Sequence, residues 1–255
     1  MPTDLRLPTH DEAVAGAERV LATLREQWTL LLLLVVGGGV FAAMVAASAE
    51  VYDNVQESDE LAGLDQPVLD AMVEARSPGL DQLVTAYTDL GGVVWAPVAT
   101  TLLVVGLALL WRSWTPVVLM LVATAGSLTM TAVGKMVIAR DRPGTDLAVP
   151  PYETSAAFPS GHALNAVVIA GIIAYLLVLR SRSAQVGVVV VVLAVLHAVL
   201  MGLSRVYLGH HWLTDVLVAW FVGTAWLALV ITVHQLVLRR TASRARRREA
   251  VLDAR

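Results

Sequence analysis

Residues 158–167 read FPSGHALNAV, and the predominantly apolar run that begins at Ala163 continues to Leu179. A run of this length can cross a hydrocarbon core of roughly 30 Å as a tilted helix. His162 stands directly at its mouth, where an ionisable side chain requires a polar partner, solvent or a chemical task. The other segments of the sequence decide between these alternatives.

The whole chain is strongly apolar. It has 255 residues, of which 57% are hydrophobic and 15% are charged, and its mean hydropathy is +0.69. The apolar stretches that suit one transmembrane helix each are Trp28–Ala49, Val93–Trp111, Trp114–Ala139, Ala163–Leu179, Val186–Leu203 and Trp212–Leu238. Because these runs lack a period of two and hydrocarbon cannot satisfy open strand edges, we predict an all-α, polytopic membrane protein with a six-transmembrane-helix bundle.

The positions of these runs divide the chain into three segments. Residues 1–27 lack the apolar core of a cleavable signal peptide, so we expect the first span to stay as an anchor. Residues 28–238 form the six-helix membrane domain, in which the acidic segment 50–92 is predicted to contain one or two short interfacial helices. Residues 239–255 form a basic tail, which can meet lipid headgroups and which we expect to be a disordered topology signal.

The basic residues indicate an orientation. Cytoplasmic segments retain Arg and Lys near the spans, so this rule assigns both termini to the cytoplasm and the protein to the cell membrane. Five basic residues then lie on the outer side, and they are Arg76, Lys135, Arg140, Arg142 and Arg205. Most of them lie beside apolar ends, where they require an anionic partner.

The first of three charged segments is KMVIARDRP, residues 135–143. Lys135 is the only lysine of the chain and lies in the last turns of the third predicted span. Pro143 disfavours helical geometry at Arg142 and is predicted to end the span. A rigid turn would aim Lys135 and Arg142 at one point, whereas snorkelling to the interface is the alternative for Lys135.

The second segment is PSGH, residues 159–162, at the start of the fourth predicted span. Ser160 is predicted to cap the helix, whose first N–H groups and dipole attract oxyanions. Gly161 lets a ligand approach the backbone closely. His162 would then lie beside the anion and could transfer a proton near neutral pH, although an interfacial capping histidine is the alternative.

The third segment is SRVYLGHHWLTD, residues 204–215. Arg205 offers a planar fork that can bind two phosphoryl oxygens at once. His211 and Asp215 are four residues apart at a helix start, so they share a face and can hydrogen-bond. A carboxylate on one imidazole nitrogen leaves the other free to attack. His210 is the rival nucleophile, but it lacks the four-residue spacing to Asp215.

Together the three segments read K-x6-R-P, P-S-G-H and S-R-x5-H-x3-D, in this order. This pattern resembles the signature of the type 2 phosphatidic acid phosphatase family, and the resemblance extends from about Tyr87 to Val233. It implies an enzyme that hydrolyses a lipid phosphate with neither metal nor other cofactor. It also implies a helical core shared with soluble acid phosphatases and vanadium haloperoxidases.

The resemblance further implies a role for each matching residue. His211 corresponds to the nucleophile that becomes phosphohistidine, Asp215 orients it, and His162 protonates the leaving group and later activates water. The groups expected to hold the phosphoryl oxygens are Lys135, Arg142, Ser160, the Gly161 amide and Arg205. Arg140 and Asp141 occupy unfixed positions of the first segment, where we expect them to pair with each other.

The leading hypothesis is therefore hydrolysis of a phosphomonoester or diphosphate of a membrane lipid at the outer face. Phosphatidic acid, phosphatidylglycerophosphate and an undecaprenyl diphosphate carrier are all compatible with it, since no motif reads the tail. A lipid-linked phosphotransferase would use the same intermediate. A non-hydrolytic lipid-phosphate binder or translocator would not require a histidine paired with an i+4 carboxylate. The chain has no cysteine, Gly-rich phosphate loop, metal-spaced His cluster or nucleic-acid motif.

Overall fold

The computed structural model describes residues 10–57 and 61–253, and within these ranges every regular element is a helix. The six predicted spans correspond to α1 (His10–Glu57), α4 (Trp95–Trp111), α5 (Thr115–Ile138), α6 (Gly161–Arg180), α7 (Ala184–Tyr207) and α8 (Leu213–Asp253). Five of these helices are long and apolar enough to cross a membrane, while α4 is a shorter apolar helix of 17 residues. The predicted all-α membrane bundle is confirmed.

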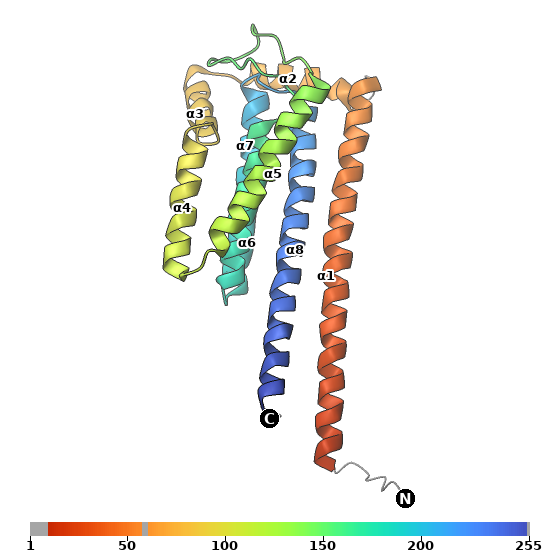
Figure 1. Cartoon of the computed structure of the whole chain (residues 1–255). Coiled ribbons are helices and arrows are strands. Elements are labelled where there is room, and N and C mark those ends of the chain that lie inside the picture. The colour runs from red at the N-terminus through yellow and green to blue at the C-terminus, as the bar shows by residue number, and fades with distance from the viewer. Residues whose placement is uncertain (1–9, 58–60, 254–255) are drawn as a thin grey trace, which may run out of the picture.

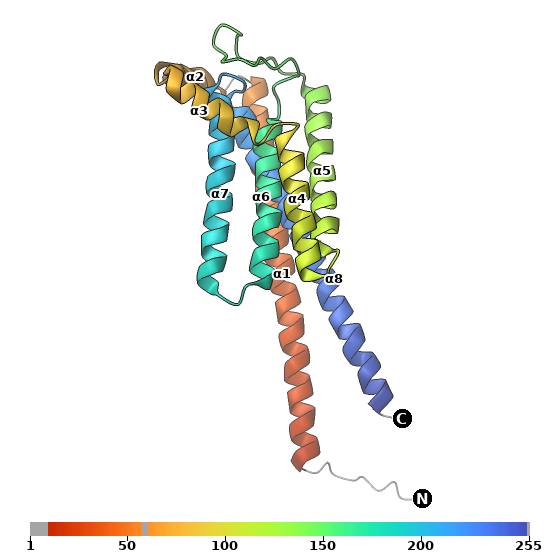
Figure 2. The same ribbon diagram turned by 90° about the vertical axis from the view of Figure 1, so that its left-hand side faces the viewer.

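The acidic segment between α1 and α4 contains two short helices. After a 3-10 turn at Ala62–Leu64, α2 spans Asp65–Glu74 and α3 spans Pro78–Asp89. Both lie at the same end of the bundle as the long connection between α5 and α6 (Figure 1). The start of α1 and the end of α8 lie at the opposite end, which Figure 2 shows from a second direction.

Helix α6 occupies the centre of the bundle and positions the PSGH segment. Its residues Leu164, Val168, Ile172 and Leu176 repeat every four positions and are fully buried. This stripe packs in one core with residues of α5 and α8, and α6 also contacts α7 along its length. In a membrane such close packing holds helices together, because lipid tails are as apolar as the helix surface.

The structure differs from the sequence-based bounds where helices leave the apolar runs. Helix α1 begins at His10 and α8 continues to Asp253, so the expectation of a disordered basic tail is wrong for residues 239–253. These extensions are rich in Ala, Arg, Glu and Leu, which favour helix independently of the membrane. Helix α5 ends five residues before Pro143, at Ile138, and Ala139 adopts left-handed backbone angles of φ 47° and ψ 34°.

Candidate active site

Two connections cover the end of the bundle that carries the charged segments. Residues 139–160 join α5 to α6, and residues 208–212 join α7 to α8. The Ala157 N–H donates to the Arg140 carbonyl at 2.8 Å, and the Val149 N–H donates to the Leu208 carbonyl at 2.9 Å. The longer connection therefore folds back on itself and is joined to the connection between α7 and α8.

Both candidate histidines, His162 and His211, line the same cavity, whose volume is about 560 Å³. Its other polar lining residues include Lys135, Arg142, Glu153, Ser155 and Asn165, and Gly161 also lines the cavity. Residues from all three charged segments are thus brought to one place, although the segments lie far apart in the sequence.

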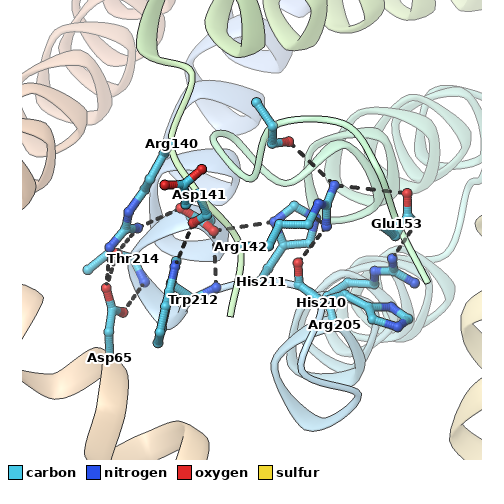
Figure 3. A network of polar contacts seen from close by, with 12 residues as sticks. Asp65, Arg140, Asp141, Arg142, Glu153, Arg205, His210, His211, Trp212 and Thr214 are labelled. Atoms are coloured by element: carbon cyan, nitrogen blue, oxygen red, sulfur yellow. Dashed lines mark hydrogen bonds and ion pairs between the residues drawn. The ribbon is translucent and has the colours of Figure 1, made fainter. Parts of the chain in front are cut away.

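The His211 ring lies between a carboxylate and a guanidinium group. Its Nδ1 is 3.4 Å from Oδ2 of Asp215, and the same oxygen accepts the Trp212 N–H at 3.0 Å. On the other side of the ring, NH1 of Arg142 lies 3.2 Å from Nε2 (Figure 3). Because a guanidinium can only donate, Nε2 is the acceptor nitrogen and Nδ1 carries the proton toward Asp215. This tautomer directs the Nε2 lone pair toward Arg142, and an electrophile that takes up the Arg142 N–H groups would leave the lone pair free to attack.

The surroundings of His211 also decide its charge. The residue is 2% exposed. Burial lowers the pKa of His211 well below its ordinary value, and the nearby cations Arg142, Arg205 and Lys135 lower it further. The imidazole is therefore neutral at neutral pH, as a nitrogen nucleophile must be.

His210 is placed differently from its neighbour. Its Nε2 lies 2.8 Å from the carbonyl of Val149, so the ring is engaged with the folded-back connection. His210 is not among the residues that line the cavity. Burial and the Arg205 cation lower its pKa to about 4. The geometry thus favours His211 as the reactive imidazole.

Arg205 is paired inside the site with an acidic residue that the sequence patterns did not single out. Its NH2 donates to Oε1 of Glu153 at 2.6 Å, and its NH1 donates to the Thr88 hydroxyl at 3.2 Å. Burial alone would raise the pKa of Glu153, but the guanidinium groups of Arg205 and Arg142 outweigh it and hold that pKa below its ordinary value. An ionised carboxylate therefore lies against the predicted phosphate-binding cations.

Lys135 and Arg142 both reach the connection that precedes α6. Nζ of Lys135 donates to the Ser155 hydroxyl at 3.1 Å and to the Ala156 carbonyl. Nε of Arg142 donates to the Ser155 carbonyl at 2.6 Å, and its NH1 donates to the His210 carbonyl. The Lys135 ammonium group thus donates hydrogen bonds to the connection within the site. Snorkelling to the membrane interface alone does not account for its position.

The start of α6 departs from the sequence-based expectation in one respect. Ser160 is the N-cap residue, but its side chain makes no capping hydrogen bond and its buried hydroxyl has no partner among the described residues. Its backbone N–H donates to the Asp215 carbonyl at 3.2 Å, which ties the starts of α6 and α8 together. At Gly161 a Cβ would lie 3.2 Å from Cγ2 of Thr131, so a side chain there would fill space beside the cavity.

Arg140 and Asp141 do not pair with each other, contrary to the expectation from sequence. NH1 of Arg140 donates to Oδ1 of Asp215 at 2.6 Å, and its NH2 donates to Oδ2 of Asp65 at 2.7 Å. The Asp141 carbonyl accepts the indole N–H of Trp212 at 2.9 Å. No spacing rule in the sequence indicates Asp65 or Glu153, because both reach the site through contacts between distant segments.

Comparison with known proteins places this arrangement in a family. Residues 116–239 match the model of the PAP2 superfamily. The chain is 33% identical over 193 residues to phosphatidylglycerophosphatase B of Bacillus subtilis, an alignment that covers 75% of this chain and 91% of the relative. It is also 29% identical over 141 residues to an undecaprenyl-diphosphatase of Sulfolobus acidocaldarius, covering 54% of this chain and 61% of that protein.

Two solved structures share the fold. The crystal structure of a transmembrane PAP2 type phosphatidylglycerolphosphate phosphatase from Bacillus subtilis matches with a TM-score of 0.68 and 29% identity, covering 79% of this chain and 96% of that one. Aquifex aeolicus LpxE matches with a TM-score of 0.53 and 21% identity, covering 66% and 94% of the two chains, which is a likeness of fold alone. These similarities show that the chain belongs to the PAP2 superfamily.

Proposed function

We propose that this membrane lipid phosphatase hydrolyses a phosphomonoester or diphosphate of a lipid through a phosphohistidine on His211. The observation that carries the proposal is the cavity shared by His162, His211 and the cations Lys135 and Arg142. Cations that are already in position stabilise the negative charge that develops on the phosphoryl oxygens in the transition state. A neutral imidazole beside them supplies the nucleophile.

In the first step, Nε2 of His211 forms a bond to phosphorus, and the bond from phosphorus to the lipid oxygen breaks. Protonated His162 gives its proton to that leaving oxygen, so a monoester leaves as the lipid alcohol and a diphosphate as the lipid monophosphate. The ring of His211 gains positive charge, and the Asp215 carboxylate stabilises it through the Nδ1–H.

In the second step, His162 is neutral and accepts a proton from water, whose oxygen attacks phosphorus. The bond between phosphorus and Nε2 breaks, and inorganic phosphate leaves. His211 returns to its neutral form and His162 to its protonated form. One water molecule is consumed in each turnover.

The apolar part of the cavity supports a lipid substrate. Beyond the histidines, the lining consists largely of α4 and α5 side chains, such as Val105, Leu121 and Leu128. These three side chains are exposed on the bundle surface, so the cavity is continuous with the lipid-facing side of the two helices. A hydrocarbon tail can lie there while the phosphate stays at the cations.

The distribution of basic residues supports an active site at the outer membrane face, with both termini in the cytoplasm. His162 lies in the first turn of α6 and His211 lies just before α8, so both lie opposite the C-terminal end of α8 (Figure 1). Candidate substrates are phosphatidylglycerophosphate, phosphatidic acid and undecaprenyl diphosphate. The names of the two relatives support the first and the third of these.

The test is phosphate release by the purified, detergent-solubilised protein from a panel of these three lipids. We expect turnover in the presence of a chelator and no turnover in the His211→Ala variant. Strict dependence on Mg²⁺, or wild-type turnover in His211→Ala, would refute the proposal. An added alcohol acceptor separates hydrolysis from phosphotransfer, because a phosphotransferase would form a new phosphate ester in place of inorganic phosphate.

A further inference from the structure

Asp65 is a buried carboxylate at the first position of α2, and it lies outside the segment that matches the family model. It is 3% exposed. Its Oδ1 accepts the Thr214 N–H at 2.9 Å, and its Oδ2 accepts the Thr214 hydroxyl at 2.6 Å and NH2 of Arg140 at 2.7 Å (Figure 3). A charge buried this deeply is tolerated only when it is paired and hydrogen-bonded. Asp65 therefore fixes α2 against the first turn of α8.

Arg140 connects Asp65 to the carboxylate beside His211. Its NH1 donates both to Oδ1 of Asp215 at 2.6 Å and to the Thr214 hydroxyl at 2.7 Å. Its guanidinium carbon lies 5.7 Å from the centre of the Trp212 ring, which further limits its movement. Asp215 is completely buried. One guanidinium group is thus shared between two buried carboxylates.

This sharing has an electrostatic consequence for the Asp215 carboxylate. Two carboxylates and one guanidinium leave the group with one net negative charge, whereas Arg140 and Asp215 alone would be neutral. Arg140 occupies Oδ1 of Asp215, so Oδ2 still faces Nδ1 of His211 at 3.4 Å. The negative charge is therefore available where the ring becomes positive during phosphoryl transfer.

We infer that Asp65 is a positioning residue for the reaction: it holds Arg140 and Thr214 so that Asp215 keeps both the orientation and the negative charge that support His211. This inference rests on the proposed function, since it acts through the proposed nucleophile. Asp65 itself lies behind Asp215 and does not contact the cavity.

The test is Asp65→Asn, which keeps the shape and one acceptor oxygen but removes the charge. We expect kcat to fall about 10–100-fold and KM to change less than about twofold, because the phosphate-binding cations are untouched. Orthovanadate adopts the geometry of phosphoryl transfer, and its inhibition constant should rise about tenfold. The matched control is Asp70→Asn, since Asp70 is an exposed residue of the same helix whose carboxylate pairs with Gln66 at 2.7 Å. This control should behave as wild type.

A purely structural role would lower the amount of active protein and leave kcat per active site and the orthovanadate constant unchanged, and that result would overturn the inference. Arg140→Lys is the second variant, since it keeps a positive charge but cannot bridge both carboxylates, and it should show the same fall in kcat and the same rise in the orthovanadate constant. Wild-type values in either variant would also overturn the inference. His211→Ala separates the two levels: if it retains turnover, the proposed function fails, and if it is inactive while Asp65→Asn is normal, only this inference fails.

Discussion

The carboxylate of Glu153 lies 2.6 Å from the guanidinium of Arg205, measured from Oε1 to NH2. Its other oxygen, Oε2, is 3.9 Å from NH2 of Arg142. Glu153 lines the cavity that holds both histidines. In the proposed function a phosphoryl group binds the same donors, so the carboxylate would compete with it for Arg205.

Replacing Glu153 by Gln is therefore expected to strengthen inhibition by inorganic phosphate. The Glu153 side chain is 34% exposed, so solvent screens the pair and the inhibition constant should fall only about 3- to 10-fold. The measurement is competitive inhibition of lipid phosphate hydrolysis. Glu74→Gln, on the exposed face of α2, should leave the constant unchanged. An unchanged or larger constant in Glu153→Gln would contradict the competition.

The second prediction concerns pH. Because burial and the surrounding cations lower the pKa of His211, the proton that would block Nε2 binds only well below the ordinary histidine pKa. Arg142→Gln removes one of those cations, so the pKa of His211 should rise and the acidic limb of kcat/KM should move to higher pH. Wild type and the variant are both profiled from about pH 4.5 to about pH 8 on the same substrate, so that the ionisation of the substrate cancels in the comparison. A limb that stays in place or moves to lower pH would argue against a neutral His211 nucleophile.

The third prediction tests the apolar part of the cavity. Leu128 of α5 lines it, whereas Val133 of the same helix is exposed and is not among the lining residues. Leu128→Trp should lower kcat/KM about tenfold for a long-chain lipid phosphate and less than about twofold for a short-chain, water-soluble phosphomonoester. Val133→Trp should change neither. Equal losses on both substrates would show that the cavity does not hold the tail.

The fourth prediction concerns the packing of α1 on α8. A Cβ at Gly37 would lie 2.1 Å from Oγ1 and 3.2 Å from Cβ of Thr232, whereas a Cβ at Gly38 would meet nothing within 4 Å. Both Gly→Ala changes gain the same helix propensity, roughly 1 kcal/mol, so their difference isolates the steric contact. Gly37→Ala should be less stable than Gly38→Ala by about 1–3 kcal/mol, seen as a lower midpoint of thermal inactivation in detergent. Equal midpoints would mean that α1 is not tightly packed on α8.

Much of the fold could be predicted from the sequence, because crossing hydrocarbon imposes a helix and a minimum apolar length. The start of α1 and the end of α8 could not, since these two helices continue into polar residues that favour helix without being apolar. The apolar run placed the end of α5 to within one residue, at Ala139, but it did not predict the left-handed turn at that residue. Its left-handed Ala139 is an ordinary residue in sequence terms, while Pro143 carries the stronger stop signal.

In the candidate site, too, local sequence features were predictable and contacts between distant segments were not. His162, His211, Lys135 and Arg142 could be singled out because ionisable residues beside apolar runs require a task, and the structure brings them to one cavity. The partners of Arg140 and Arg205 could not be found, since they are chosen by contacts between distant segments. The contact of the Ser160 backbone N–H with the Asp215 carbonyl could not be found either, because it joins two different helices.

The proposed phosphohistidine on His211 is tested most directly by trapping it. Protein is mixed with a lipid whose phosphate is radiolabelled, quenched in base, in which phosphohistidine is stable, and then digested and mapped. We predict label on His211 and none on His210. Turnover without labelled protein at any time, or label on a residue other than His211, would contradict the account.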